Sequence, residues 1–275
     1  MKSTVFIGGG RITTALIAGL RRAGYNKPIV VHDRNPQKLR ALNKNFRIIA
    51  EPNLNRAVAR AELLIIAVRP DAVHKILRDV QADTKLAASG SRTKRRKHPL
   101  IAISLAAGIP LAHLRSELGP PVRWVRAMPS PVSSSGNGLT ALAFARGLAQ
   151  SQRNQVRDLF ANVGAVIEIP EAQFDTFTVT YSSTHGYHAL AALAESAIKL
   201  GLDRQSAFLA AAHALADGIN YWRSGNIPLD RLLDEAATPG GVAATTMSAM
   251  DKAGHRRAVE KGLQAGLQRT RANAQ

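Results

Sequence analysis

Short apolar runs alternate with amphipathic stretches over the first 170 residues of the chain. Apolar residues recur at helical spacing over residues 12–20, and the same spacing returns after Pro36 and after Asp71. Continuous apolar runs separated by such helices are typical of a parallel sheet that is covered on both faces. The predicted strands are residues 4–7, 29–31, 46–49, 63–68, 100–103, 122–125, 139–144 and 166–169.

The pattern changes after Pro170. Residues 186–222 are rich in Ala and Leu at helical spacing, and further helical patterns cover residues 229–235 and 245–275 without a strand-like run. We therefore expect an α/β protein in which a doubly wound parallel sheet is followed by an all-helical domain. The expected domains are residues 1–170 and 171–275.

A glycine-rich segment joins the first predicted strand to the first predicted helix. Residues 8–13, GGGRIT, fit the pattern G-x-G-x-x-[small]. In this pattern Gly8 allows a tight turn and Gly10 lets the backbone approach a pyrophosphate at the helix N-terminus, whereas Thr13 replaces a third glycine where helix and strand pack closely. An acidic residue, Asp33, ends the second predicted strand. The segment predicts a Rossmann-type dinucleotide site.

Two neighbouring residues bear on the choice of coenzyme. Asp33 would accept hydrogen bonds from a ribose diol, which favours NAD, whereas Arg34 could pair with a 2′-phosphate, which favours NADP. The surplus positive charge of this half of the chain suits the more anionic coenzyme. We expect NADP, with NAD as the alternative.

Composition and charge narrow the class of protein further. The 275 residues include 37 Lys and Arg against 19 Asp and Glu, and the whole excess of +18 falls within residues 1–150, because residues 151–275 hold 12 of each. A hydrophobic share of 45% excludes a disordered polycation. The chain has no Cys, which excludes disulfides and thiolate metal sites. No apolar run of membrane-spanning length lacks charges, so we expect a soluble, cytoplasmic protein.

Five of the basic residues are concentrated in residues 92–97, between Ser- and Gly-rich and His-Pro flanks. This composition is typical of a solvated loop, and no aromatic side chain is present there to stack on a base. A contact with an anion or with nucleic acid is the alternative for this stretch. For the protein as a whole we expect no nucleic-acid partner.

Five motifs, in order along the chain, resemble those of the pyrroline-5-carboxylate reductase family, which supplies the last enzyme of proline biosynthesis. They are residues 6–10 (FIGGG), 67–70 (AVRP), 104–108 (SLAAG), 126–129 (RAMP) and 238–241 (TPGG). The first motif is common to dinucleotide-binding proteins, and the others are specific as a set. Together they span nearly the whole chain, with the basic stretch as an insertion.

The resemblance implies an oxidoreductase that transfers hydride from NAD(P)H to the C=N carbon of a cyclic imine, 1-pyrroline-5-carboxylate, giving proline. It also implies a Rossmann domain followed by a helical domain that holds substrate and forms a homodimer, with larger rings left open. By motif, the residues near the cofactor would be Ile7, Gly8, Gly9, Gly10, Arg11, Ile12, Asp33, Arg34, Asn35, Ala67, Val68, Arg69, Pro70, Leu105, Ala106 and Ala107.

The substrate end departs from the family pattern. The family has Asn where this chain has Ser130, and a Thr that would hydrogen-bond the substrate nitrogen where this chain has Ala243. The candidates to replace that hydroxyl as catalytic residues are Thr246, one turn along the same helix, and His185 or Tyr187 in a second altered segment, residues 181–187. The resemblance assigns substrate contacts to Met128, Pro129, Ser130, Thr238, Gly240, Gly241, Val242 and Ala243.

Alternatives to this function stay open. One is a related reductase acting on another imine or carbonyl substrate, and another is a non-catalytic regulator that binds NAD(P) or nucleic acid on the same fold. We expect no metal site, because His185, His188 and His213 have only Glu195 as a nearby acidic residue in the sequence.

Overall fold

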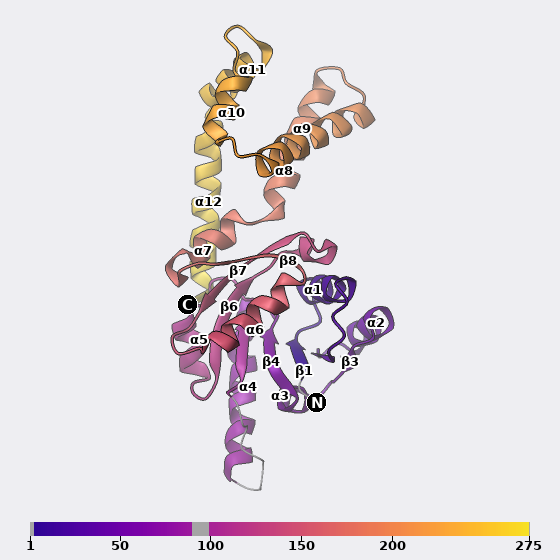
Figure 1. The fold of residues 1–275 in the computed structure, drawn as a ribbon, viewed down its shortest axis with the longest axis vertical. Helices are drawn as coiled ribbons and strands as arrows, with labels where there is room; N and C mark the ends of the chain where they lie inside the picture. The colour runs from indigo at the N-terminus through magenta and orange to yellow at the C-terminus, as the bar shows by residue number, and fades with distance from the viewer. Residues whose placement is uncertain (1–2, 90–98, 275) are drawn as a thin grey trace. The chain divides into compact units, whose positions relative to one another are not determined.

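A computed structural model describes residues 3–89 and 99–274 (Figure 1). The chain forms two compact units, the first made of Met1–Tyr181 and Leu267–Gln275 and the second of Ser182–Gly266. The expected domain boundary at residue 170 stays a prediction, and helix α7 (Glu171–Thr180), just beyond it, belongs to the first unit. The basic stretch, residues 92–97, lies outside the described residues.

The first unit is built on one eight-stranded sheet with the order β3-β2-β1-β4-β5-β6-β7-β8. All neighbouring strands are parallel except β6 and β7, so the expectation of a parallel sheet is wrong at that pair. The two strands are antiparallel because the segment between them is short and contains only the 3-10 helix η1 (Pro131–Ser135). A parallel pair would need a crossover of a dozen or more residues. The strands are β1 (Ser3–Ile7), β2 (Ile29–His32), β3 (Ile49–Ala50), β4 (Ala61–Ile66), β5 (Ile101–Ser104), β6 (Arg123–Met128), β7 (Gly138–Phe144) and β8 (Gly164–Glu168).

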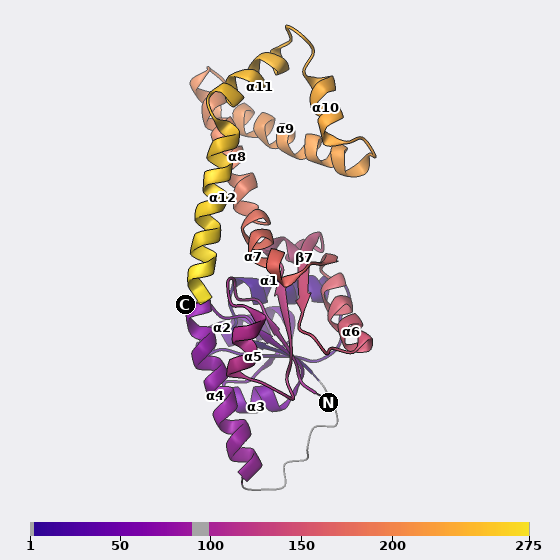
Figure 2. The same ribbon diagram turned by 90° about the vertical axis from the view of Figure 1, so that its left-hand side faces the viewer.

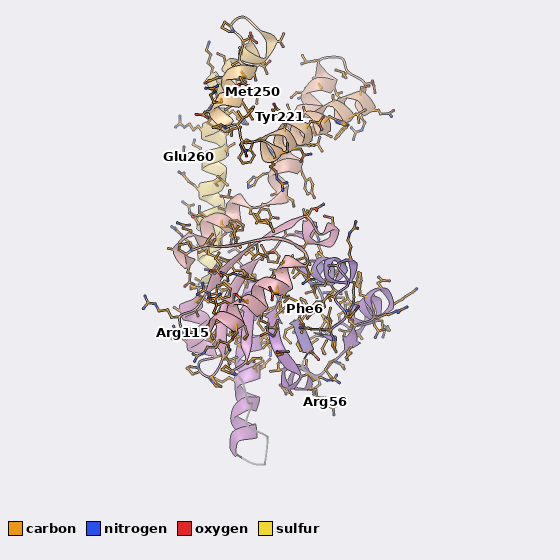
Figure 3. All side chains as sticks on the ribbon, in the orientation of Figure 1. Phe6, Arg56, Arg115, Tyr221, Met250 and Glu260 are labelled. Carbon is orange, nitrogen blue, oxygen red and sulfur yellow. The ribbon has the colours of Figure 1, made fainter. Side chains whose placement is uncertain are left out.

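Helices cover both faces of this sheet, and Figure 2 shows α4 and α6 on opposite sides of it. Successive side chains of a strand point to opposite faces, so Phe6 packs in the core of one face while Val5 and Ile7 pack in the core of the other (Figure 3). The helices on the Phe6 face are α1 (Arg11–Arg22), α2 (Pro36–Phe46) and α6 (Gln150–Ala161), and those on the other face are α3 (Leu54–Ala59), α4 (Pro70–Ser89) and α5 (Leu111–Glu117).

The strand expected at residues 46–49 is misplaced. Helix α2 continues to Phe46, and Arg47 then takes a left-handed conformation with φ 52° and donates its N–H to the carbonyl of Asn43. This residue ends the helix, and the short strand β3 begins only at Ile49. An apolar run of four residues does not show by itself whether it ends a helix or forms a strand.

The second unit is helical, as expected. Three of its helix pairs are separated by glycines with positive φ, Gly201 at 107°, Gly240 at 76° and Gly254 at 86°. No helix within the described ranges is both long and apolar enough to cross a membrane. The helices are α8 (Ser183–Lys199), α9 (Arg204–Ser224), α10 (Leu229–Ala236), α11 (Val242–Lys252) and α12 (His255–Arg271), which ends in the first unit.

Candidate active site

The predicted cofactor residues of the first unit converge at one edge of the sheet. Ile7 pairs with His32 of β2 and with Ile66 of β4, and Ile66 pairs with Ser104 of β5, so these four parallel strands end side by side. The strand order reverses between β1 and β4, which is where open α/β sheets bind ligands. The segments that follow the four strands are residues 8–10, 33–35, 67–70 and 105–107.

The glycine loop makes a tight turn against the start of the 67–70 segment. Gly8 has φ 103°, and a Cβ on it would lie 2.5 Å from the carbonyl oxygen of Ala67. Its N–H donates to the carbonyl of His32 at 2.7 Å. Thr13 is fully buried, and its hydroxyl donates to the carbonyl of Gly8 at 2.6 Å. The Thr that stands in place of the third glycine therefore fits the site and fastens the turn to α1.

The N-terminus of α1 opens onto free space. Gly10 is the residue before the helix, no side chain caps it, and nothing lies within 4 Å of the position that a Cβ on Gly10 would occupy. The first helical N–H groups have no partner within the helix, and they carry the positive end of its dipole. The first turn holds no acidic residue, whereas the exposed Arg11 adds a positive charge. These features fit a bound pyrophosphate.

Asp33 holds the glycine loop through its carboxylate. One oxygen accepts the N–H of Gly9 at 2.7 Å and the other accepts the N–H of Asn35 at 2.8 Å, and the side chain is 14% exposed. Asn35 in turn caps α2, because its side-chain oxygen accepts the N–H of Lys38. Arg34, between them, is exposed. Both carboxylate oxygens of Asp33 therefore serve the protein backbone, while the Arg34 side chain faces solvent at the same edge.

The C-terminal segment supports the loop that follows β5. The Leu105 N–H donates to the carbonyl of Ile66 at 3.0 Å, which extends the sheet pairing into this loop. The side-chain amide of Asn273 donates to the carbonyl of Ala107 at 3.2 Å, and the backbone of Thr270 packs against Gly108. This support could not be predicted from the sequence, since the partners lie 166 residues apart in the chain.

Ser130 is fixed by a tyrosine from the end of α7. Its hydroxyl lies 3.0 Å from the hydroxyl of Tyr181, which also accepts the N–H of Leu139 at 2.7 Å. Ser130 is buried, and the hydroxyl of Tyr181 links it to the backbone of β7. We did not predict this pair, although Ser130 and Tyr181 both lie in segments that depart from the family pattern.

Arg126 fastens the RAMP segment to α7. Its guanidinium is buried, lies 2.6 Å from the carboxylate of Asp175 and 3.6 Å from that of Glu171, and stacks over the ring of Phe174 at 4.2 Å. Met128, two residues further along β6, packs in the same apolar cluster as Phe174. Arg126 therefore holds the RAMP segment, to which the family resemblance assigns substrate contacts, against α7.

The TPGG segment of the second unit forms a turn directly before α11. The N–H of Gly241 donates to the carbonyl of Thr238 at 2.9 Å, and Gly240 has φ 76°. Gly241 precedes the helix without a side-chain cap, so the N–H groups of Val242 and Ala243 point out of its first turn. This geometry fits a carboxylate.

The three candidate replacement residues lie on two helices of the second unit, Thr246 on α11 and His185 and Tyr187 on α8. The hydroxyl of Thr246 donates to the carbonyl of Val242 at 2.9 Å, so its proton is used within α11 while its oxygen can still accept a hydrogen bond. His185 is exposed in the first turn of α8. The catalytic roles of Thr246 and His185 stay predictions.

Comparisons with known proteins agree with the motifs. Residues 3–89 match the family model "NADP oxidoreductase coenzyme F420-dependent", and residues 171–273 match "Pyrroline-5-carboxylate reductase dimerisation". The chain is 32% identical to a pyrroline-5-carboxylate reductase of Mycobacterium tuberculosis, over 98% of this chain and 96% of that protein. It is also 32% identical to the enzyme of that name from Thermus thermophilus, over 96% and 95% of the two chains.

The fold agrees as well. The crystal structure of Plasmodium falciparum pyrroline carboxylate reductase with NADP bound superposes with a TM-score of 0.85 at 19% identity, covering 100% of this chain and 98% of that one. The family is supported by the strand order, by the motif loops that meet at one edge of the sheet, and by the full-length relatives. The chain belongs to the pyrroline-5-carboxylate reductase family.

Proposed function

We propose that this protein reduces 1-pyrroline-5-carboxylate to proline with hydride from NADPH. The observation that carries the proposal is the meeting of the glycine loop with the 67–70 and 105–107 segments at the point where the strand order reverses. Each full-length relative named above is a pyrroline-5-carboxylate reductase.

The residues of the first unit bind and orient the cofactor. The uncapped N-terminus of α1 holds the pyrophosphate, and the bare backbone at Gly10 allows the close approach. The 67–70 and 105–107 segments orient the nicotinamide ring, which supplies the hydride when it is bound. The protein contributes position rather than a reactive group, since hydride transfer depends on the alignment of the two reacting carbons.

The coenzyme preference follows from the end of β2. Asp33 directs both carboxylate oxygens to backbone N–H groups, whereas the exposed Arg34 offers its guanidinium to a 2′-phosphate. The structural relative from Plasmodium falciparum carries NADP. These observations support NADPH over NADH.

At the substrate end, the TPGG turn binds the carboxylate of the imine through backbone N–H groups. Ala243 supplies no hydroxyl to the substrate nitrogen, so Thr246 or His185 takes over that contact. The pocket is thereby retuned relative to the family, and another cyclic imine is the second candidate substrate.

The protein works as a homodimer formed by its helical unit. In this unit only Ala194, Ala207 and Ala211 of α8 and α9 are buried, whereas large apolar side chains such as Leu209 and Trp222 are exposed. Exposed apolar surface of this extent marks an interface. Larger rings, a cytoplasmic location and the absence of a nucleic-acid partner stay predictions.

Isotope transfer tests the reaction directly. NADPH deuterated at C4 of the nicotinamide, with each face labelled in turn, is incubated with the protein and 1-pyrroline-5-carboxylate, and the product is analysed by mass spectrometry and NMR. We expect proline with deuterium at C5 from one of the two labelled faces, and slower turnover with NADH. NADPH oxidation without labelled proline, or faster turnover of another cyclic imine, would contradict the proposed substrate.

A further inference from the structure

Two imidazoles and one carboxylate meet between α4 and α5, on residues that the proposed reaction does not use. His74 lies on α4, while His113 and Glu117 lie one turn apart on the same face of α5. The Nδ1 atom of His74 lies 2.5 Å, and the Nε2 atom of His113 3.9 Å, from the same carboxylate oxygen of Glu117. One ligand atom from each residue lies within 4.8 Å of the other two.

These distances suit a metal ion. Zn²⁺ binds imidazole nitrogen at about 2.0–2.1 Å in tetrahedral geometry, which places neighbouring ligand atoms about 3.3 Å apart. The observed pairs bracket that value, so small side-chain rotations bring all three atoms to it. Two His and one carboxylate form a known ligand set for zinc, with water in the fourth position.

The charges around the carboxylate also favour a cation. The chain has a net charge of +18, yet among the residues whose side chains are described no Lys or Arg pairs with Glu117, whose side chain is only 15% exposed. Arg115, on the same helix, lies on the opposite face and extends into solvent (Figure 3). Among the described side chains, the ion-pair partners of Glu117 are therefore the two imidazoles.

The two helices hold the three ligands in place. Leu114, between the ligands on α5, is fully buried, and Val73 and Leu77 beside His74 on α4 belong to the same apolar core. His74 is 48% exposed and His113 34%, so an ion can reach them from solvent. A preformed and accessible set of this kind loses little entropy when a metal binds.

We propose that His74, His113 and Glu117 bind one Zn²⁺ ion per chain. The ion replaces the direct contact between the Nδ1 atom of His74 and the carboxylate of Glu117, and it links α4 to α5. Helix α4 begins at Pro70, the last residue of the 67–70 segment, and α5 begins at Leu111, shortly after the 105–107 segment, so the ion stabilises the supports of both predicted nicotinamide loops. The site does not depend on the proposed reaction.

Zinc binding to untagged, chelator-treated protein tests the proposal. Equilibrium dialysis with elemental analysis measures stoichiometry, and Co²⁺ in place of Zn²⁺ reports coordination through its visible absorption. We expect one Zn²⁺ per chain and a higher Tm with Zn²⁺. His74→Gln, His113→Gln and Glu117→Gln should each weaken binding by at least about 10-fold, since even outer-shell partners of metal ligands are worth about 10- to 100-fold.

His213→Gln is the matched control, because His213 and Asp217 also form an exposed pair one turn apart, and among the residues that the structure describes they belong to no group of three such ligands. This variant should bind Zn²⁺ as the wild type does. Circular dichroism confirms that each variant is folded. Because there are three separate substitutions, the test remains valid if one of the variants does not fold. Less than one Zn²⁺ per chain in the wild type, or unchanged binding in folded His74→Gln and His113→Gln proteins, would overturn the proposal.

Discussion

Replacing Gly10 with Ala should separate cofactor binding from folding. The backbone at Gly10 has φ −83°, and no atom lies within 4 Å of an added Cβ. Ala restricts the unfolded chain more than Gly does, which stabilises the folded protein by about 0.4–1 kcal/mol. Ala is also less favourable than Gly at the position before a helix, which destabilises the folded protein by a similar amount. The free energy of unfolding should therefore change by less than about 1 kcal/mol.

The same methyl group would project into the space proposed for the pyrophosphate. Overpacking at a close contact costs about 1–3 kcal/mol, which raises the Kd for NADPH by about 5- to 150-fold. Fluorescence titration with NADPH measures this change, and urea denaturation measures stability on the same sample.

Gly8→Ala is the matched variant, in which we expect the main effect to be on the free energy of unfolding. Its φ of 103° adds about 1–3 kcal/mol of strain, and the Cβ placed 2.5 Å from the Ala67 carbonyl oxygen adds about 1–3 kcal/mol of overlap, so the free energy of unfolding should fall by about 2–6 kcal/mol. A folded Gly10→Ala protein with unchanged NADPH affinity would refute the assignment of that surface to the cofactor. A Gly8→Ala protein as stable as the wild type would show that the turn does not require glycine at this position.

Three further predictions concern single side chains. Arg34→Ala should raise the Kd for NADPH by about 10- to 150-fold and leave that for NADH nearly unchanged, because only the 2′-phosphate loses a charged partner; equal losses in titrations with both coenzymes would exclude this role. Tyr181→Phe should lower the free energy of unfolding in urea by about 1–3 kcal/mol, since the buried Ser130 hydroxyl and the partly buried Leu139 N–H lose their hydrogen-bond partner, and an unchanged midpoint would show that the network adds no stability. Hydrogen bonds from Ser206 lower the pKa of Asp203 below its ordinary value, so its contribution to stability is present above about pH 4 and disappears as the pH falls through the lowered pKa. Asp203→Ala should therefore be less stable than the wild type at pH 7 with a smaller difference under acid conditions, and a difference independent of pH would contradict the shift.

The sheet could be predicted because its strands are buried on both faces. Such strands appear as continuous apolar runs, and the runs at residues 4–7, 29–31 and 100–103 coincide with strands of the structure within one residue at each end. Helices α3 and α5 were not predicted, since six or seven residues hold too few turns to show a period. The antiparallel pair was not predicted either, because the predicted strands end at residue 125 and begin again at 139, which leaves room for a crossover, whereas β6 continues to Met128 and β7 already begins at Gly138.

Some parts of the candidate site could also be predicted from the sequence, and others could not. The glycine loop and Asp33 could be found because their spacing is local, and the structure brings them together through the Gly9 N–H. Contacts between distant parts of the chain, such as Ser130 with Tyr181, leave no periodic trace. The His74 site shares that property, since its ligands come from two helices.

The most direct test of the account is the kcat/KM for 1-pyrroline-5-carboxylate with NADPH, measured for the wild type and for Ala243→Thr. A hydrogen bond to a charged group is worth about 1.5–3 kcal/mol, so restoring the hydroxyl in the first turn of α11 should raise kcat/KM by about 10- to 150-fold if nothing has replaced it, and by less if Thr246 or His185 has. Both proteins should produce proline, and kcat/KM should be higher for the variant. No proline from either protein would contradict the function, and a kcat/KM for Ala243→Thr that is not higher than that of the wild type would contradict the inference that the pocket lacks a hydroxyl at position 243.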